Sequence, residues 1–164
     1  MIALFKLLRL CLAALLAASF FVSAAYAQKW VKFAPFPEPG EEIYGIAAGG
    51  KFYVFGGLGP RWTPRGLVYE YDPATDKWTK KKPMALASHH VALAELNGKI
   101  YVMGGFVPPQ SGPPAWVPID NAWEYDPEND SWKALAPVPT KRGSPNAAVV
   151  RLSGWMFDEA RSPW

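Results

Sequence analysis

The stretches FYVFGG (residues 52–57) and IYVMGG (residues 100–105) decide the fold, because a chain of 164 residues contains nearly the same pattern twice. Each stretch is an apolar, aromatic run typical of a β-strand, and each ends in two glycines. Forty-eight positions separate the two copies. Repetition at such a period is typical of propellers and other repeat folds. The sequence therefore predicts a repetitive architecture built from strands.

The repetition extends well beyond these two stretches. When Trp30, Trp78 and Trp132 are aligned, apolar runs follow each of them at residues 43–48, 91–96 and 147–152. A turn, a glycine-ended strand and a variable loop come next. VYEYDPATDKW (68–78) then matches AWEYDPENDSW (122–132), with Asp-Pro turn chemistry in the middle. Each complete repeat thus contains four strand signals separated by turns.

Four short antiparallel strands in about 50 residues form one blade of a β-propeller. The order of apolar strand, Asn-Gly, Ile-Tyr-Val-Met-Gly-Gly, Glu-Tyr-Asp-Pro and Trp resembles the kelch repeat, from residue 30 to about 154. The resemblance implies an all-β, partial kelch-type propeller with two complete four-stranded blades and parts of two others. We expect the aromatic repeat residues to pack between blades and the glycines to sit where backbones approach closely. The structural repeat residues are Gly56, Gly57, Tyr71, Asp72, Trp78, Gly104, Gly105, Tyr125, Asp126 and Trp132.

Residues 1–27 resemble a secretory signal peptide instead of a part of the propeller. Lys6 and Arg9 precede an apolar run, and Ala25-Tyr26-Ala27 provides small residues for cleavage before Gln28. The alternative is a retained membrane anchor. We expect a helical signal peptide and a secreted or periplasmic product, with no membrane association after cleavage.

Cleavage would leave little charge and no cysteine. The net charge falls from +3 to +1, which gives no indication of nucleic-acid binding. The only cysteine, Cys11, lies within the signal peptide, so the mature chain would have no disulfide and no thiolate chemistry.

The repeat pattern stops after Gly154. We therefore expect an incomplete propeller over residues 28–154 and an off-pattern tail over 155–164. A truncated propeller is favoured over a short chain that completes a ring by oligomerising, since the pattern ends abruptly. Unpaired blade edges would then make self-association a hazard.

Two loops after the double glycines are candidates for binding. LGPRWTPRG (58–66) contains Arg61, Trp62 and Arg65, and FVPPQSGPPAWVP (106–118) contains Trp116. Exposed aromatic rings with arginines suit sugars, carboxylates or acidic peptides. The alternative is that both tryptophans cover the edge of the core.

A second set of candidates is expected at the mouth of the central channel. Glu41-Glu42, His89-His90 and Pro145-Asn146 precede the innermost strands at positions that look equivalent, and Arg142 is expected to reach the same rim. Adjacent residues on a strand point to opposite sides, so we expect His89 and His90 not to share an ion. The prediction is no metal, no cofactor and no catalytic residue.

Two functions remain open. The first is a module that binds a protein or glycan ligand through its loop face. The second is an enzyme acting on sugars, because secreted kelch-like propellers include copper radical oxidases and sialic acid mutarotases. The oxidase needs a Tyr–Cys cross-link, which the loss of Cys11 disfavours. No phosphate loop, zinc spacing or nucleophile motif is present in the sequence.

Overall fold

The computed structural model describes residues 29–113 and 115–150. The chain divides into two compact units, Met1–Lys32 and Phe33–Trp164, and all described strands belong to the second unit. The expected signal peptide and the tail over 155–164 lie outside the described residues. Within the described part, no helix has the length and apolar character needed to cross a membrane.

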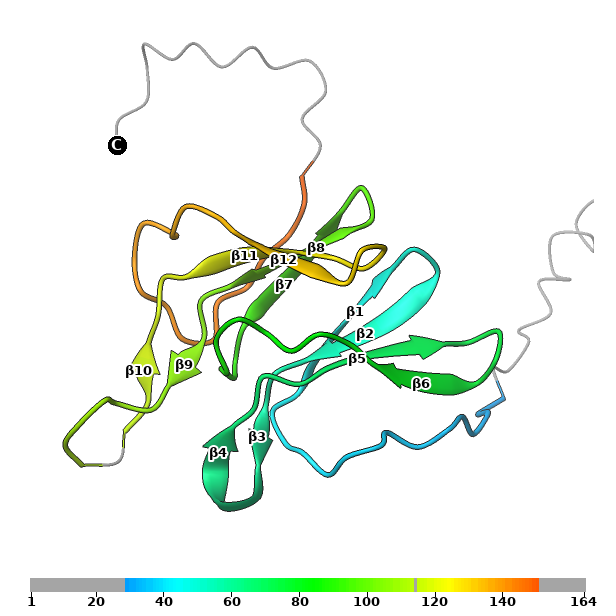
Figure 1. The fold of residues 1–164 in the computed structure, drawn as a ribbon, viewed down its shortest axis with the longest axis horizontal. Helices are drawn as coiled ribbons and strands as arrows, with labels where there is room; N and C mark the ends of the chain where they lie inside the picture. Colours follow the sequence, from blue (N-terminus) through cyan, green and yellow to red (C-terminus); the bar gives the residue numbers. More distant parts are fainter. Residues whose placement is uncertain (1–28, 114, 151–164) are drawn as a thin grey trace, which may run out of the picture. The chain divides into compact units, whose positions relative to one another are not determined.

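The first sheet is a four-stranded antiparallel meander whose spatial order follows the chain, β1-β2-β5-β6 (Figure 1). Tyr71 pairs directly with Trp78 across the last two strands. The strands are β1 (Tyr44–Ala48), β2 (Lys51–Phe55), β5 (Val68–Asp72) and β6 (Lys77–Lys80).

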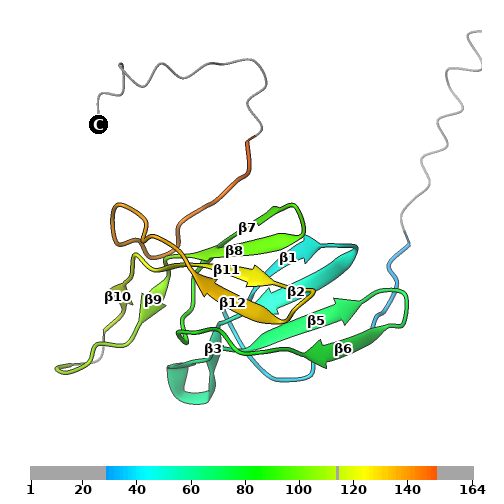
Figure 2. The same cartoon turned by 45° about the horizontal axis from the view of Figure 1, so that its top comes forward.

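The second sheet repeats the first, in the order β7-β8-β11-β12. Tyr125 pairs with Trp132 in the same register as Tyr71 and Trp78, so the two tryptophans occupy matching positions in adjacent sheets. Figure 2 shows the sheets side by side, with β1 and β7 in contact. The predicted pair of complete four-stranded blades is therefore confirmed. The strands are β7 (Ala92–Leu96), β8 (Lys99–Met103), β11 (Ala122–Asp126) and β12 (Ser131–Ala134).

A small hairpin projects from each blade between its second and third long strands. Leu58–Gly59 (β3) pairs with Thr63–Pro64 (β4) in the first blade, and the turn between them, Pro60–Trp62, has a left-handed backbone at Arg61 and Trp62. Phe106–Val107 (β9) pairs with Val117–Pro118 (β10) in the second. The repeat is 54 residues long there instead of 48, and the hairpin loop contains the whole difference.

The core lies between the two blades. Phe55 of β2 is fully buried and packs edge-to-face on Tyr125 and Trp132 of the second blade, at centroid distances of 5.7 and 6.0 Å. Such rings bury large apolar areas and add a geometric preference. The expected packing between blades is confirmed for Tyr125 and Trp132, whereas Tyr71 and Trp78 contact Phe33 and Phe36 of the segment before β1. Other core residues are Tyr53, Val68, Ile100 and Val102 of the two sheets and Val91 just before β7.

Each blade also binds the segment that leads into it, through a tyrosine, an aspartate and a tryptophan that we call the clasp. In the first blade, Asp76 accepts from the backbone N–H of Ala34 at 2.7 Å and from the Tyr71 hydroxyl at 2.7 Å. The indole N–H of Trp78 donates to the carbonyl of Ala34 at 3.1 Å. Both backbone groups of one residue are thus satisfied by side chains.

The second blade forms the same clasp around Lys82, in the segment that joins β6 to β7. Asp130 accepts from the Lys82 backbone N–H at 3.0 Å and from Tyr125 at 2.7 Å, and Trp132 donates to the Lys82 carbonyl at 3.2 Å. The conserved spacing of these side chains within the repeat therefore fixes the chain path between consecutive blades.

The double glycines lie where the next segment approaches closely. Gly104 and Gly105 have φ of 61° and 103°, and a Cβ on either would lie 2.7 Å from a backbone carbonyl, of Arg142 and His89 respectively. Side chains are excluded both by the left-handed backbone and by the lack of space. The expected role of these glycines is confirmed.

Two expected strands are missing from the described residues. Residues 29–40, around Trp30, and residues 147–150 have no strand assignment. A strand needs a hydrogen-bonding neighbour, and the described residues provide no partner sheet for either segment.

We predict that Asp130→Ala lowers the free energy of unfolding by about 2–3 kcal/mol, because the buried Tyr125 hydroxyl and the Lys82 N–H lose a charged acceptor. Urea unfolding followed by tryptophan fluorescence measures this change. Glu128→Ala, in the same turn but exposed, is the control and should change stability by less than about 0.5 kcal/mol. Equal stabilities of the two variants would show that the clasp is not a stabilising contact.

Candidate functional site

The site begins with an unusual backbone conformation just before each innermost strand. Glu41 and His89 each form an isolated antiparallel bridge, to Leu58 and Phe106 respectively. The next residue in each blade, Glu42 or His90, has a left-handed backbone with φ of 54°. Such a conformation is uncommon for a residue with a Cβ and redirects the side chain that follows the bridge.

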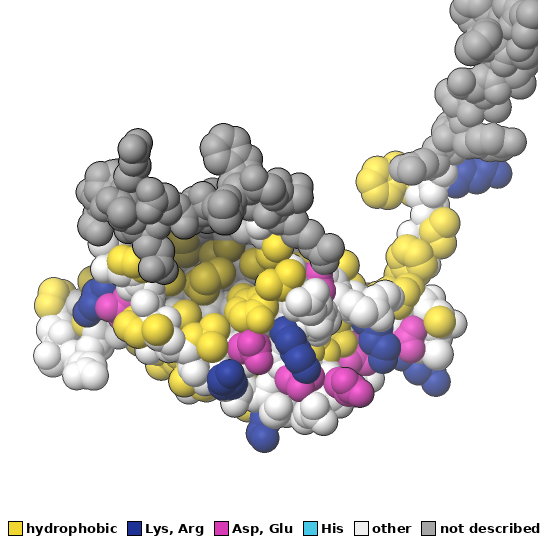
Figure 3. Space-filling model, turned by 90° about the horizontal axis from the view of Figure 1, so that it is seen from above, with side chains coloured by type: hydrophobic (Ala, Val, Ile, Leu, Met, Phe, Trp, Pro, Cys, Tyr) yellow, Lys and Arg dark blue, Asp and Glu magenta, His cyan; other side chains and the backbone are white. Residues whose placement is uncertain are grey.

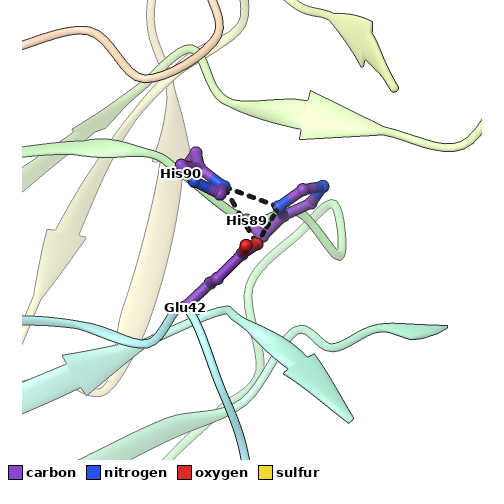
Figure 4. A group of neighbouring side chains, drawn as sticks. All are labelled: Glu42, His89 and His90. Carbon is purple, nitrogen blue, oxygen red and sulfur yellow. Dashed lines mark hydrogen bonds and ion pairs between the residues drawn. The ribbon is translucent and has the colours of Figure 1, made fainter. Parts of the chain in front are cut away.

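This turn brings three ligand-type side chains together (Figure 4). Glu42 Oε2 lies 2.8 Å from His89 Nδ1 and 3.0 Å from His90 Nδ1, and the two Nδ1 atoms are 2.8 Å apart. Glu42 comes from the first blade and both histidines from the second. We call this group the rim triad.

The prediction that His89 and His90 cannot share an ion is wrong in its geometry. It assumed the alternation of an extended strand, but the positive φ of His90 places both Nδ1 atoms on one side. The expected equivalence of Pro145-Asn146 is also wrong. Ser144, with φ of 50°, is the residue that matches Glu42 and His90, and each of the three stands twelve residues after its repeat tryptophan.

His89 is the buried member of the triad, with 1% of its surface exposed. Burial lowers the pKa of His89, and the neighbouring Glu42 carboxylate opposes that shift. The other ring nitrogen, Nε2, is buried and has no hydrogen-bond partner. The neutral imidazole is therefore the favoured form, and it is the form that can donate a lone pair.

A groove lies between the two projecting hairpins, and both tryptophans predicted to bind a ligand, Trp62 and Trp116, line it. It has a volume of about 530 Å³ and is lined by Arg61 and Trp62 on one side and by Pro108, Pro109 and Trp116 on the other. Trp62 is 58% exposed and Trp116 is 40% exposed. Both rings are therefore accessible from the groove, and the Trp116 ring also covers the buried His89, as the alternative of a cover over the edge of the core expected.

The groove and the rim triad share a wall. The Trp116 ring packs edge-to-face on His89 at a centroid distance of 4.3 Å, and Phe106 lies 5.7 Å from the same imidazole. Binding in the groove and occupation of the triad would therefore involve the same aromatic side chain.

The two remaining predicted residues, Arg65 and Arg142, belong neither to the groove lining nor to the rim triad. Arg65 forms an ion pair with Glu38 and donates to the carbonyl of Pro39 at 3.2 Å. Arg142 is exposed, and its backbone bonds to Ile119 and Gly105. Neither residue lines the groove.

Glu38 is the centre of an ion-pair cluster that the sequence did not reveal. The Tyr69 hydroxyl and the Lys80 ammonium group, 2.9 Å away, donate to its carboxylate and lower its pKa to about 2. Arg65 contributes its charge to the same shift. These partners are 27 to 42 positions distant in the chain, so no local motif could have identified the group.

Charge on the face shown in Figure 3 is mixed. Hydrophobic side chains gather in one area, and basic and acidic side chains alternate along its border. A surface that binds nucleic acid normally has a basic patch or stripe, which this face lacks.

Two adjacent four-stranded meanders, joined through their innermost strands and a shared core, define the chain as a β-propeller of kelch type. The family model for the Kelch motif matches residues 46–85 and 87–139, together more than half of the chain. The chain belongs to the kelch repeat family, as the repeat pattern predicted.

Individual relatives agree with this assignment. Kelch-like protein 25 of Xenopus tropicalis is 34% identical over 133 residues, which are 80% of this chain and 22% of that protein. Kelch-like protein terF of Aspergillus terreus is 30% identical over 123 residues, 73% of this chain and 26% of that protein. The chain thus spans about a fifth to a quarter of the length of these curated relatives.

The fold is also similar to a solved structure, described as that of YjhT. The TM-score is 0.56 at 23% sequence identity, and the match covers 68% of this chain and 32% of that one. At this identity the similarity supports the fold alone.

We predict that Glu38→Gln makes stability less sensitive to acid. Because the pKa of Glu38 falls from 4.5 to about 2 on folding, its contribution is complete above pH 4.5 and is lost as the pH falls toward 2. Urea titrations at pH 7, 4 and 2.5 should show that the variant has a lower free energy of unfolding than the unchanged protein at pH 7, and that this difference shrinks at low pH. A difference of the same size at all three pH values, or a similar trend in the exposed Glu128→Gln control, would contradict the assignment.

Proposed function

We propose that this kelch propeller module binds a protein ligand, and that it takes an extended, acidic peptide segment in the groove between the β3–β4 and β9–β10 hairpins. The observation that carries the proposal is the pair of exposed tryptophans that line one groove from two different blades. Tryptophan and arginine are the residues most enriched among binding hot spots.

The shape of the groove suits a peptide. Its volume of about 530 Å³ is within the range of about 300–1,000 Å³ found for ligand sites, and it is open instead of enclosed. Pro108 and Pro109 stiffen one wall, which limits the conformational entropy lost on binding. Aromatic-lined grooves accept extended peptide segments in several recognition domains.

The charge of the groove suits an acidic ligand. Arg61 lines the groove and has no ion-pair partner among the described residues. A guanidinium group offers two parallel donors to a carboxylate, so an acidic side chain beside the tryptophans would gain a bidentate contact.

A sugar ligand is the second candidate, because a ring can stack on Trp116 while the rim triad contacts its hydroxyl groups. In its enzymatic form this is the mutarotase-like alternative, with Glu42 and the histidines as acid–base groups. Anomer exchange of free sialic acid, followed by NMR, tests it directly, and an unchanged rate with added protein would remove it.

We also propose that residues 1–27 direct export and are then removed. The support is the sequence of a basic start, an apolar run and Ala25-Tyr26-Ala27. Expression with the full N-terminus should give an exported product that begins at Gln28 in mass spectrometry, and a retained Met1 would contradict the proposal.

We predict that Trp62→Ala and Trp116→Ala each weaken peptide binding at least tenfold, since each removes one aromatic wall of the groove. Selection from a random peptide library should enrich acidic sequences with the unchanged protein and lose that enrichment with Arg61→Glu. Affinities of the selected peptides are then measured by fluorescence anisotropy.

Trp30→Ala is the matched control, because it removes an exposed tryptophan that is not among the lining residues of the groove. Selected peptides that bind both groove variants as tightly as the unchanged protein would refute the proposal. A signal on a glycan array, with none on peptides, would establish the second candidate instead.

A further inference from the structure

We propose that the rim triad is a binding site for a divalent transition metal ion of the Zn²⁺ class. Glu42 would provide one carboxylate oxygen and His89 and His90 their Nδ1 atoms. The inference depends on the geometry of these three residues and not on the peptide groove.

The spacing of the three atoms is close to that of a metal site. They are 2.8, 2.8 and 3.0 Å apart. Ligands at about 2.0–2.1 Å from a tetrahedral zinc ion lie roughly 3.3 Å from each other. The three ligand atoms would therefore have to move apart by only a few tenths of an ångström to admit the ion, and side-chain rotation can supply that movement.

Protons alone cannot satisfy this triangle while Glu42 is a carboxylate and both histidines are neutral. If both Nδ1 atoms carry a proton, two donors face each other 2.8 Å apart. If only one does, the other nitrogen presents a lone pair to the Glu42 carboxylate at 3.0 Å or less. With Glu42 ionised, every arrangement of neutral histidines leaves one edge repulsive, whereas a cation at the centre attracts all three lone pairs.

The identity and number of the donors define the kind of ion. Two imidazoles and one carboxylate suit zinc and the neighbouring first-row metals, whereas Mg²⁺ and Ca²⁺ prefer oxygen ligands only. The Glu42 and His90 side chains are 31% and 27% exposed, so a water molecule can reach the fourth position. Two imidazoles, a carboxylate and an open position are the donor set of several zinc sites.

The surroundings of the triad also favour an ion. The rings of Trp116 and Phe106 flank His89 at 4.3 and 5.7 Å, and Tyr44 lies 5.8 Å from His90. These apolar walls exclude water from one side and strengthen the attraction between the ion and Glu42. They also restrict the imidazoles to orientations in which both Nδ1 atoms face the Glu42 carboxylate.

A bound ion would join the two blades, because Glu42 belongs to the segment before β1 and the histidines to the segment before β7. Ligands that bind only the folded state stabilise it by mass action. The melting temperature of the full chain should therefore rise with Zn²⁺ concentration.

The test is a titration of the full chain with Zn²⁺ against a chromogenic chelator, with Mg²⁺ in parallel. We expect one zinc ion per chain with a micromolar or lower Kd, no competition by Mg²⁺, and a weakening of at least tenfold in Glu42→Gln and in His90→Asn. Glu41→Gln removes the adjacent, exposed carboxylate and should bind like the unchanged protein.

His89 is buried, so its replacement could unfold the chain, and a second measurement uses the unchanged protein. X-ray absorption of the zinc-loaded chain should show two imidazole ligands and oxygen, and the Co²⁺ form should show the intense visible bands of a tetrahedral site. Absence of stoichiometric binding, an all-oxygen shell, or equal affinity in Glu42→Gln, His90→Asn and Glu41→Gln would overturn the inference.

Discussion

The clasp is the contact on which the arrangement of the blades depends. A tyrosine that pairs with a tryptophan across the last two strands of a blade donates to an aspartate. The aspartate and the tryptophan then bind the backbone N–H and carbonyl of one residue in the preceding segment. Backbone groups outside regular sheets must find partners, and here a side-chain cluster supplies them. The blade thereby determines the path of the chain that enters it, and the same Tyr125 and Trp132 rings pack on Phe55 in the core between the blades.

Most of the fold could be predicted from the sequence because these contacts are made by residues at fixed spacing. The register of Trp78 with Tyr71 and of Trp132 with Tyr125 follows from the Tyr-Asp-Pro turns, and the glycine pairs mark the ends of β2 and β8. Strands without a neighbouring sheet could not be placed, since pairing depends on a partner and not on the apolar pattern of residues 147–150 alone.

The candidate site was only partly predictable. The two tryptophans of the groove were identified because exposed aromatic residues in proline-rich loops are conspicuous. The convergence of His89 and His90 was missed because a left-handed backbone at a histidine has no reliable sequence signal. Counting twelve residues from each tryptophan would have aligned Ser144 correctly with Glu42 and His90, whereas the apolar pattern misplaced it.

The left-handed residue that recurs twelve positions after each repeat tryptophan has a constant backbone and a variable side chain. Glu42, His90 and Ser144 share a backbone conformation that the repeat imposes, yet they differ completely in chemistry. A repeated left-handed residue twelve positions after each repeat tryptophan thus presents a different side chain from the same kind of backbone turn. Chemical variety arises there by substitution at single positions, with no change in the path of the chain.

The extra length of the second repeat is confined to the segment after Gly104-Gly105, while the strands on either side keep the register of the first blade. The two ends of that segment are anchored by paired β-strands, so its interior can grow without disturbing either neighbour. The tip of this hairpin is accordingly a natural acceptor site for grafted sequences, such as an epitope, a fluorophore tag or a foreign recognition loop. Insertions at this tip can likewise produce new binding specificities while the two blades keep their strand pairing.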